Sequence, residues 1–144
     1  MTEFYSALAS LISNLKIYVE LGENSICIKP LKSNNFLIGI SEDNVEYTLF
    51  FDGWHTHFPK NQDGQNSILS HTLFALTKQV RLKIYERGCF KYKFVPQSLS
   101  NGKWKNWPSL SIYKMNRFFI WERRNIIFLQ NDYTTKEIID KHFE

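Results

Sequence analysis

The residues best suited to chemistry lie in one short stretch, DGWHTH at 52–57. If this stretch continues a strand, His55 and His57 point to the same face. Two imidazoles on one face, with a carboxylate as third ligand, are typical of zinc and other divalent sites, and an open coordination position would allow a metal-dependent hydrolase. Asp52 is out of phase with the histidines unless a bulge at Gly53 turns it. No HExxH or CxxC pattern supports the pair, so partly exposed histidines are the simpler interpretation, and no metal or cofactor is predicted.

A second candidate is the basic middle of the chain. Residues 78–124 hold twelve Lys and Arg against two acidic residues, whereas both flanking segments contain more acidic than basic residues. In this stretch basic residues alternate with apolar ones across an expected hairpin, so they should share one face of a sheet. The side chains expected there are Arg81, Lys83, Lys91 and Lys93, with Tyr85 beside them and Arg123, Arg124, Trp104 and Trp107 as extensions.

Two kinds of partner fit such a face. Basic groups interleaved with aromatic rings suit single-stranded nucleic acid, through phosphate contacts and base stacking. The same groups suit an acidic protein surface, because Trp, Tyr and Arg dominate the energetics of protein interfaces. Trp54, Trp104 and Trp107 are all expected in or beside loops, where they either contact a partner or cover the ends of the sheet.

Catalytic patterns are scarce. The sequence has no GxSxG, Walker A or GxGxxG motif, and its carboxylates do not form an obvious acid–base pair. Cys89 follows a turn glycine and has Arg87 nearby, which could lower its pKa, but no histidine is close in sequence. A non-enzymatic protein is therefore the preferred interpretation.

The expected framework is an α+β domain over residues 1–144. Apolar spacing predicts an N-terminal helix over 4–19, ended by Gly22, and a middle helix over 69–80, capped by Asn66 or Ser67. The pair Thr134 and Glu137 forms a capping box that predicts a short C-terminal helix. Between the helices, period-two patterns and polar turns predict an antiparallel sheet of about five to six strands in two meanders. Strand signals occur in seven stretches, of which five to six are expected to form the sheet: 25–31, 36–40, 45–51, 81–85, 90–94, 109–115 and 117–130. A loop is expected at 98–108.

Composition indicates a soluble protein of the cell interior. Hydrophobic residues make up 43% of the 144 residues and charged residues 22%, which is enough for a core and argues against disorder. The N-terminus lacks a basic, apolar leader, and no stretch is long and apolar enough to span a membrane. Cys27 and Cys89 are expected to be reduced, buried thiols. The cytoplasm is thus the expected compartment.

Three stretches carry a resemblance to a protein family. They are YTLFFDGWHTHF at 47–58, LTKQVRLKIYERGCFKYKF at 76–94 and FFIWERRNIIFLQND at 118–132. Together they resemble small bacterial proteins of the toxin-immunity type, which act as stand-alone cytoplasmic partners of secreted toxins. The resemblance implies a protein that binds a toxin, and it assigns no catalytic residue. Inhibitors of nucleic-acid-degrading toxins tend to be acidic, so either the acidic ends meet a basic toxin or the basic middle meets an acidic one.

The sequence therefore predicts a protein-binding module, an immunity protein that neutralises a cognate toxin, present as a monomer or homodimer. The edge at 25–31 is the expected dimer contact. The alternatives are a nucleic-acid-binding protein that uses residues 78–124 and a metal-dependent hydrolase that uses His55 and His57. The predicted partner-binding residues are Trp54, His55, His57, Trp104, Trp107, Arg81, Lys83, Lys91 and Lys93.

Overall fold

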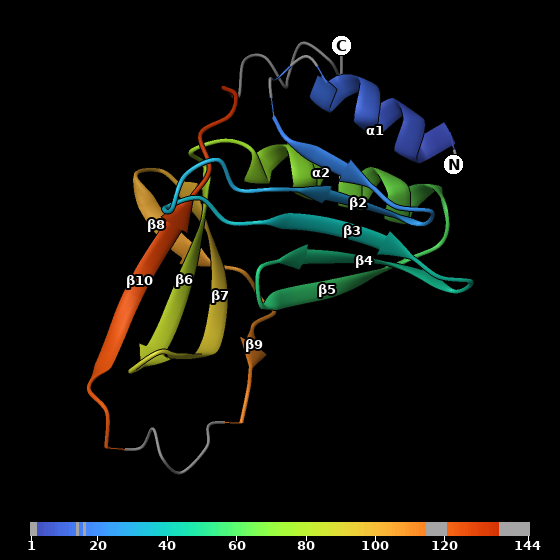
Figure 1. Cartoon of the computed structure of the whole chain (residues 1–144). Coiled ribbons are helices and arrows are strands. Elements are labelled where there is room, and N and C mark those ends of the chain that lie inside the picture. The colour runs from blue at the N-terminus through green and yellow to red at the C-terminus, as the bar shows by residue number, and fades with distance from the viewer. Residues whose placement is uncertain (1–2, 14, 16, 115–120, 136–144) are drawn as a thin grey trace.

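The computed structural model describes residues 3–13, 15, 17–114 and 121–135 (Figure 1). Its first half forms a five-stranded antiparallel sheet, sheet A, whose strands follow one another in chain order. These strands are β1 (Val19–Leu21), β2 (Ser25–Ile28), β3 (Ile38–Glu42), β4 (Glu46–Phe51) and β5 (Trp54–Pro59). The period-two pattern of the sequence is visible in β4, where Tyr47, Leu49 and Phe51 are buried and the residues between them are not.

The second half forms another antiparallel sheet, sheet B, with strand order β10-β6-β7-β8 and β9 paired to β7. Its strands are β6 (Val80–Arg87), β7 (Phe90–Ser100), β8 (Lys103–Asn106), β9 (Ser111–Ile112) and β10 (Arg124–Gln130). Since β6 lies along one edge of β7, β8 and β9 share the other edge. The strands of sheet B run across those of sheet A (Figure 1).

Two helices complete the described fold: α1 (Glu3–Ser13) and α2 (Gln62–Ala75). Both lie on one side of sheet A, and α2 also reaches β6 (Figure 1). One hydrophobic core joins both helices and both sheets, from Tyr5 of α1 through Trp54 of β5 to Ile84 of β6. The buried amide of Asn131 supports this core, because it donates to the Ala75 carbonyl and accepts from the Phe36 N–H.

The predicted α+β class is confirmed, with its antiparallel meanders, N-terminal helix and middle helix. Each meander is longer than expected and forms a five-stranded sheet of its own. The predicted C-terminal helix lies outside the described residues, apart from its first positions. No helix in the described part of the chain is long and apolar enough to cross a membrane.

Two element boundaries differ from the prediction near the N-terminus. Helix α1 ends at Ser13, whose hydroxyl donates to the Ser10 carbonyl, and Val19 pairs with Ile28 in β1 instead of continuing the helix. Because β1 covers β2, the expected free edge at 25–31 is wrong, and with it the expected dimer contact. The sequence pattern failed here because Val19 satisfies both a helical and an extended spacing.

The start of α2 was also predicted too late. Asn61 caps the helix by accepting from the Gly64 N–H at 2.9 Å, so the helix begins inside the polar stretch expected to be a loop. Gly64 is required there, since a Cβ at this position would lie 1.9 Å from the Pro59 carbonyl oxygen.

The loop expected at 98–108 is largely a hairpin. Asn101 and Gly102 both adopt positive φ, at 51° and 73°, and connect β7 to β8. An Asn-Gly pair is the residue combination that such two-residue turns favour. Trp104 consequently lies on a strand and not in a loop.

Candidate protein-binding surface

Alternate residues of β6 build the exposed face of sheet B. Leu82 and Ile84 are fully buried against the core, whereas Arg81, Lys83 and Tyr85 lie on the opposite face and are only partly covered. Because successive side chains of a strand point to opposite faces, the alternation in sequence has become an alternation of burial. The prediction that these three residues share one face is confirmed.

Arg81 is held between two aromatic rings, one from β10 and one from β8, the strand beyond β7. Its guanidinium carbon lies 4.2 Å from the ring centroid of Trp104 and 4.2 Å from that of Phe128. The Nε–H donates to the Gln97 side-chain oxygen at 2.7 Å, and the Gln97 amide in turn donates to Asn106. Burial lowers the pKa of Arg81, but an arginine remains charged in proteins. The planar cation is therefore fixed in place by stacking and by an oriented hydrogen-bond chain.

Tyr85 is surrounded by three cations. The Lys83 Nζ, the Lys93 Nζ and the Arg124 Cζ lie 5.0, 4.9 and 4.8 Å from its ring centroid. A side-chain hydrogen bond with Lys83 lowers the pKa of Tyr85; burial opposes this shift, and the three positive charges add to the lowering. Three like charges around one ring repel one another, so this arrangement favours an added negative charge.

The residues around these two centres form a continuous patch, which we call the cationic–aromatic face. It comprises Arg81, Lys83, Tyr85, Lys93, Trp104, Arg124, Ile126 and Phe128. Ile126 and Phe128 are 39% and 45% exposed, so the patch includes two large apolar side chains. No described carboxylate forms an ion pair with any cation of this face. The face thus combines exposed apolar surface with four positive charges that have no acidic partner among the described residues.

Lys91 does not belong to this face, contrary to the prediction. The register of β6 and β7 shifts between Tyr85 and Glu86, so Lys91 pairs with Glu86. An extra residue in one strand turns the following side chain to the other side of the sheet. The charge of Lys91 acts instead on Asp52 of the β4–β5 turn, whose carboxyl pKa is raised by burial and lowered by a backbone N–H and by Lys91.

Trp54 lies beside a loop, as predicted, but it does not reach the cationic–aromatic face. It begins β5, and its side chain is fully buried, with its ring 4.9 Å from Phe51 and 5.4 Å from Trp107. The indole N–H donates to the Ser109 carbonyl at 3.3 Å. Trp54 is therefore a core residue that joins β5 to the segment after β8, and of the two roles expected for it the structure shows the buried one.

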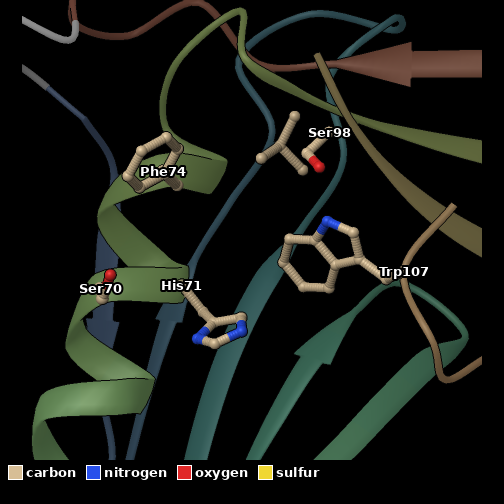
Figure 2. A pocket seen from close by; sticks show the side chains of 6 residues that line it. Ser70, His71, Phe74, Ser98 and Trp107 are labelled. Atoms are coloured by element: carbon tan, nitrogen blue, oxygen red, sulfur yellow. The ribbon is translucent and has the colours of Figure 1, made fainter. Parts of the chain in front are cut away.

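Trp107 lies on the opposite side of sheet B from the cationic–aromatic face. Figure 2 shows its indole facing His71 of α2 across a hollow, and the two rings lie 5.0 Å apart. The hollow measures about 240 Å³ and is lined by Ser70, His71, Phe74, Val80, Ser98 and Trp107. The His71 Nδ1 lies 2.6 Å from the Ser67 carbonyl, so the ring is oriented by its own helix. Arg124 and Trp104 thus extend the basic face as expected, whereas Trp107 does not.

His55 and His57 share the outer face of sheet A, as their spacing predicts. Both are exposed, and their rings lie 5.3 Å apart. The His57 Nδ1 lies 2.7 Å from the Glu46 carboxylate and 3.2 Å from the Thr48 hydroxyl, so its neighbours already use this nitrogen. The described residues contain no group of three His, Cys, Asp or Glu side chains that could hold a metal ion. The histidine pair therefore supports neither a metal centre nor the hydrolase alternative.

The two cysteines are free, as expected, but they are not both buried. Cys27 is partly covered, and burial raises its pKa above the ordinary value. Cys89 is exposed because it lies at the tip of the β6–β7 hairpin, after Gly88 with its positive φ.

Ile126 and Phe128 are the residues of the surface that the sequence did not reveal. They lie in the run Ile126, Ile127, Phe128 and Leu129, where every residue is apolar and no alternation marks the exposed positions. The pairing of β10 with β6 determines which residues of this run lie on the exposed face, since Phe128 lies opposite Lys83 and Ile126 opposite Tyr85. The only local hint was Arg124, two residues before Ile126 and therefore on the same face.

Comparisons with protein-family models, with curated proteins and with solved structures gave no match to this chain.

Proposed function

We propose that the chain is a protein-binding module of the toxin-immunity type and that its cationic–aromatic face meets an acidic region of the partner. The partner class comes from the sequence resemblance. The choice of surface comes from the structure, because four basic residues of the middle of the chain lie on one face of sheet B. Of the two charge arrangements that the resemblance allowed, the proposal adopts the basic middle and an acidic toxin.

The unpaired cations of this face are the observation that carries the proposal. Lys83, Lys93 and Arg124 surround the Tyr85 ring, and Arg81 lies on the same face between two other rings. A charge that stabilised only the monomer would gain most from an acidic neighbour within the chain, and the described residues provide none. Carboxylates of a partner would relieve the mutual repulsion of these four groups and would be drawn to the face from a distance.

The apolar part of the face supports tight binding. Phe128, Ile126 and Trp104 offer large, partly exposed side chains beside an arginine that is already immobilised. Ordering a long side chain on binding costs about 0.5–1.5 kcal/mol, and Arg81 has largely lost that freedom before the partner arrives. A central arginine flanked by aromatic residues has the composition of an interface hot spot.

Single-stranded nucleic acid is the second candidate for the same face, because aromatic rings lie among its cations. Base stacking, however, needs a free ring face. The Arg81 guanidinium covers one side of Trp104 and one side of Phe128, while three cations surround Tyr85. These cations leave fewer ring faces free for stacking, which favours carboxylates over bases as the groups recognised.

The test is affinity capture from the native host with the tagged chain and with a variant that carries Lys83→Glu, Lys93→Glu and Arg124→Glu. The matched control carries Lys32→Glu, Lys103→Glu and Lys105→Glu, all at exposed positions outside the face. Both variants change the net charge equally, so only the location of the charges differs. Bound proteins are identified by mass spectrometry, and bound nucleic acid by nuclease treatment.

The proposal predicts one stoichiometric protein partner that wild type and control capture and the face variant loses. That partner should inhibit growth when produced without this chain. Equal capture by all three proteins would remove the cationic–aromatic face from the interface. Recovery of nucleic acid alone, lost in the face variant, would establish the second candidate.

A further inference from the structure

Strand β10 forms one edge of sheet B. It pairs with β6 over Arg124–Gln130, and the described residues provide no strand on its other side. Figure 1 shows it as the outermost strand of that sheet. An edge strand exposes a row of backbone N–H and C=O groups to which another strand can be added.

The hydrogen bonds of Gln130 show which backbone groups point to that edge. Its N–H donates to the Asn34 carbonyl at 2.8 Å, and its carbonyl accepts from the Asn35 side-chain amide at 2.9 Å. Both partners lie on the side away from β6. In an antiparallel pair, residues alternate between those that bond to the neighbouring strand and those that point away from it. Phe128, Ile126 and Arg124 therefore point their backbone groups to the open edge.

The pairing on the other side of β6 agrees with this assignment. Leu82 lies opposite Leu129 in β10 and opposite Pro96 in β7. Proline has no N–H to donate, so Leu82 must form its ladder hydrogen bonds with Leu129. Asn125, Ile127 and Leu129 are then the residues of β10 whose backbone groups bond to β6.

The open backbone groups and the exposed apolar side chains belong to the same residues. The backbone groups of Ile126 and Phe128 point to the edge, and their side chains lie on the adjoining cationic–aromatic face. Arg124 adds a charge without a described acidic partner. Beyond Phe128 the edge is closed, because Asn34 and Asn35 occupy the groups of Gln130. The open stretch thus runs from 124 to 128 and borders the cationic–aromatic face.

We propose that β10 receives an extended strand from the partner protein and so continues sheet B. The proposal rests on the proposed function and names how the partner binds. The added strand would place apolar side chains beside Ile126 and Phe128 and an acidic side chain beside Arg124, since directly opposed side chains lie about 4.5–5.5 Å apart. Main-chain hydrogen bonds would hold the strand, and the side chains of the face would select it.

Charge favours a partner strand over a second copy of this chain. Pairing β10 with itself would bring two cationic–aromatic faces into one continuous surface and add four further positive charges beside the first four. An acidic strand neutralises the same surface. A dimer formed through β10 in the absence of partner would overturn the proposal.

Amide hydrogen exchange followed by NMR tests the open edge without any partner. The amides of Ile126 and Phe128 should exchange within about tenfold of the unstructured rate, and those of Ile127 and Leu129 at least about a hundredfold more slowly. Slow exchange at all four positions in the monomer would show that another part of the chain already covers the edge, and the proposal would fail.

A short synthetic peptide that alternates Val with Thr and ends in Glu is the probe for strand addition. Binding should slow exchange at Ile126 and Phe128 and leave Ile127 unchanged. The matched control is the same peptide N-methylated at the amides that would face β10, which keeps every side chain but removes the donors. Equal binding of both peptides would contradict strand addition, and so would no binding of either.

A proline variant separates this inference from the proposed function. Ile126→Pro removes an N–H that β6 does not use, so the chain should still fold, while Ile126→Val keeps that N–H. Partner captured by the wild type should bind the proline variant at least about tenfold more weakly than the valine variant. If the charge-reversed face variant loses the partner and Ile126→Pro does not, the proposed function stands and strand addition is wrong. If neither variant loses it, the proposed function fails as well.

Discussion

The charged side chains on the outer faces of the two sheets have different kinds of partner. On and beside sheet A, charged groups have acidic partners within the chain: Lys29 pairs with Glu20 at 3.1 Å, Lys60 lies 3.9 Å from Glu42, and His57 contacts Glu46. On the cationic–aromatic face of sheet B, the four cations contact aromatic rings and form no ion pair with a described carboxylate. Paired charges at a surface contribute little to binding because they are already satisfied, whereas unpaired ones remain available to a partner. Under the proposed function, sheet A would serve the fold and sheet B would contact the partner.

The two tryptophans Trp54 and Trp104 give the largest test of this contrast. Trp54→Ala removes a fully buried ring from the core behind sheet A and should lower the free energy of unfolding by about 3–5 kcal/mol. Trp104→Ala removes a partly exposed ring and should lower it by about 1–2 kcal/mol, while weakening partner binding. Urea denaturation measures both. Equal losses of stability would mean that Trp104 is as structural as Trp54.

The stacking of Arg81 gives a second test of the contrast between the two sheets, with a smaller expected effect on stability. Arg81→Ala should cost about 1–2 kcal/mol, because it removes contacts with two rings and the hydrogen bond to Gln97. A double-mutant cycle with Trp104→Ala should show a coupling of about 0.5–1 kcal/mol. Arg81→Lys keeps the charge but loses the planar group, so it should recover only part of the stability. A coupling near zero would show that the guanidinium and the indole are neighbours without an energetic interaction.

Tyrosine ionisation distinguishes the two regions by pH. The Lys83 hydrogen bond and neighbouring cations lower the pKa of Tyr85, whereas burial and the nearby Glu42 charge raise that of Tyr5, which packs under sheet A. A pH titration of phenolate absorbance should lose its earliest step in Tyr85→Phe and keep it in Tyr5→Phe. An unchanged first step in Tyr85→Phe would contradict the clustering of cations around that ring.

The same two shifts act on stability with opposite sign. Tyr85 favours its ionised form when folded, so its contribution appears as pH rises through its lowered value towards the unfolded value of about 10. Tyr5 favours its neutral form when folded, so its contribution is present below about 10 and is lost above it. Stability curves of the two Phe variants between neutral and alkaline pH should therefore diverge from the wild type in opposite directions.

The smallest effect is expected at the histidine pair of sheet A. The His57 and Glu46 side chains are 50% and 38% exposed, and ion pairs of this kind contribute about 0–1 kcal/mol. Glu46→Gln or His57→Gln should therefore change the free energy of unfolding by less than about 1 kcal/mol and leave partner binding intact. A large loss of binding in His57→Gln would move recognition to sheet A and break the contrast between the two faces.

Local sequence patterns determined much of this protein. The alternation of Arg81, Lys83 and Tyr85 with Leu82 and Ile84 was sufficient to predict a strand with one basic face, because side-chain direction in a strand depends only on position. The spacing of His55 and His57 predicted their common face for the same reason. These are short-range properties, and tertiary contacts did not override them.

Longer-range choices were decided by the tertiary structure. A bulge opposite Glu86 turned Lys91 away from the face, and no residue type at that position announces it. Trp54 is buried because α2, Phe51 and Trp107 close over it, which the hydrophobicity of one residue cannot show. Helix α2 begins earlier than predicted, with Asn61 as its cap, because Gly64 has no Cβ that would clash with the Pro59 carbonyl oxygen.

The cationic–aromatic face depends both on local sequence patterns and on the tertiary pairing of distant strands. The sequence determined which residue types are available and which of them alternate along β6 and the second half of β7. Only the pairing of β10 with β6 brings Phe128 onto Arg81 and Arg124 onto Tyr85, across more than forty and nearly forty residues of chain. The run at Ile126–Leu129 is apolar throughout, so its exposed positions follow from hydrogen bonding to β6 and not from composition. Contacts between distant strands depend on register, and register is set by the whole sheet rather than by any local pattern.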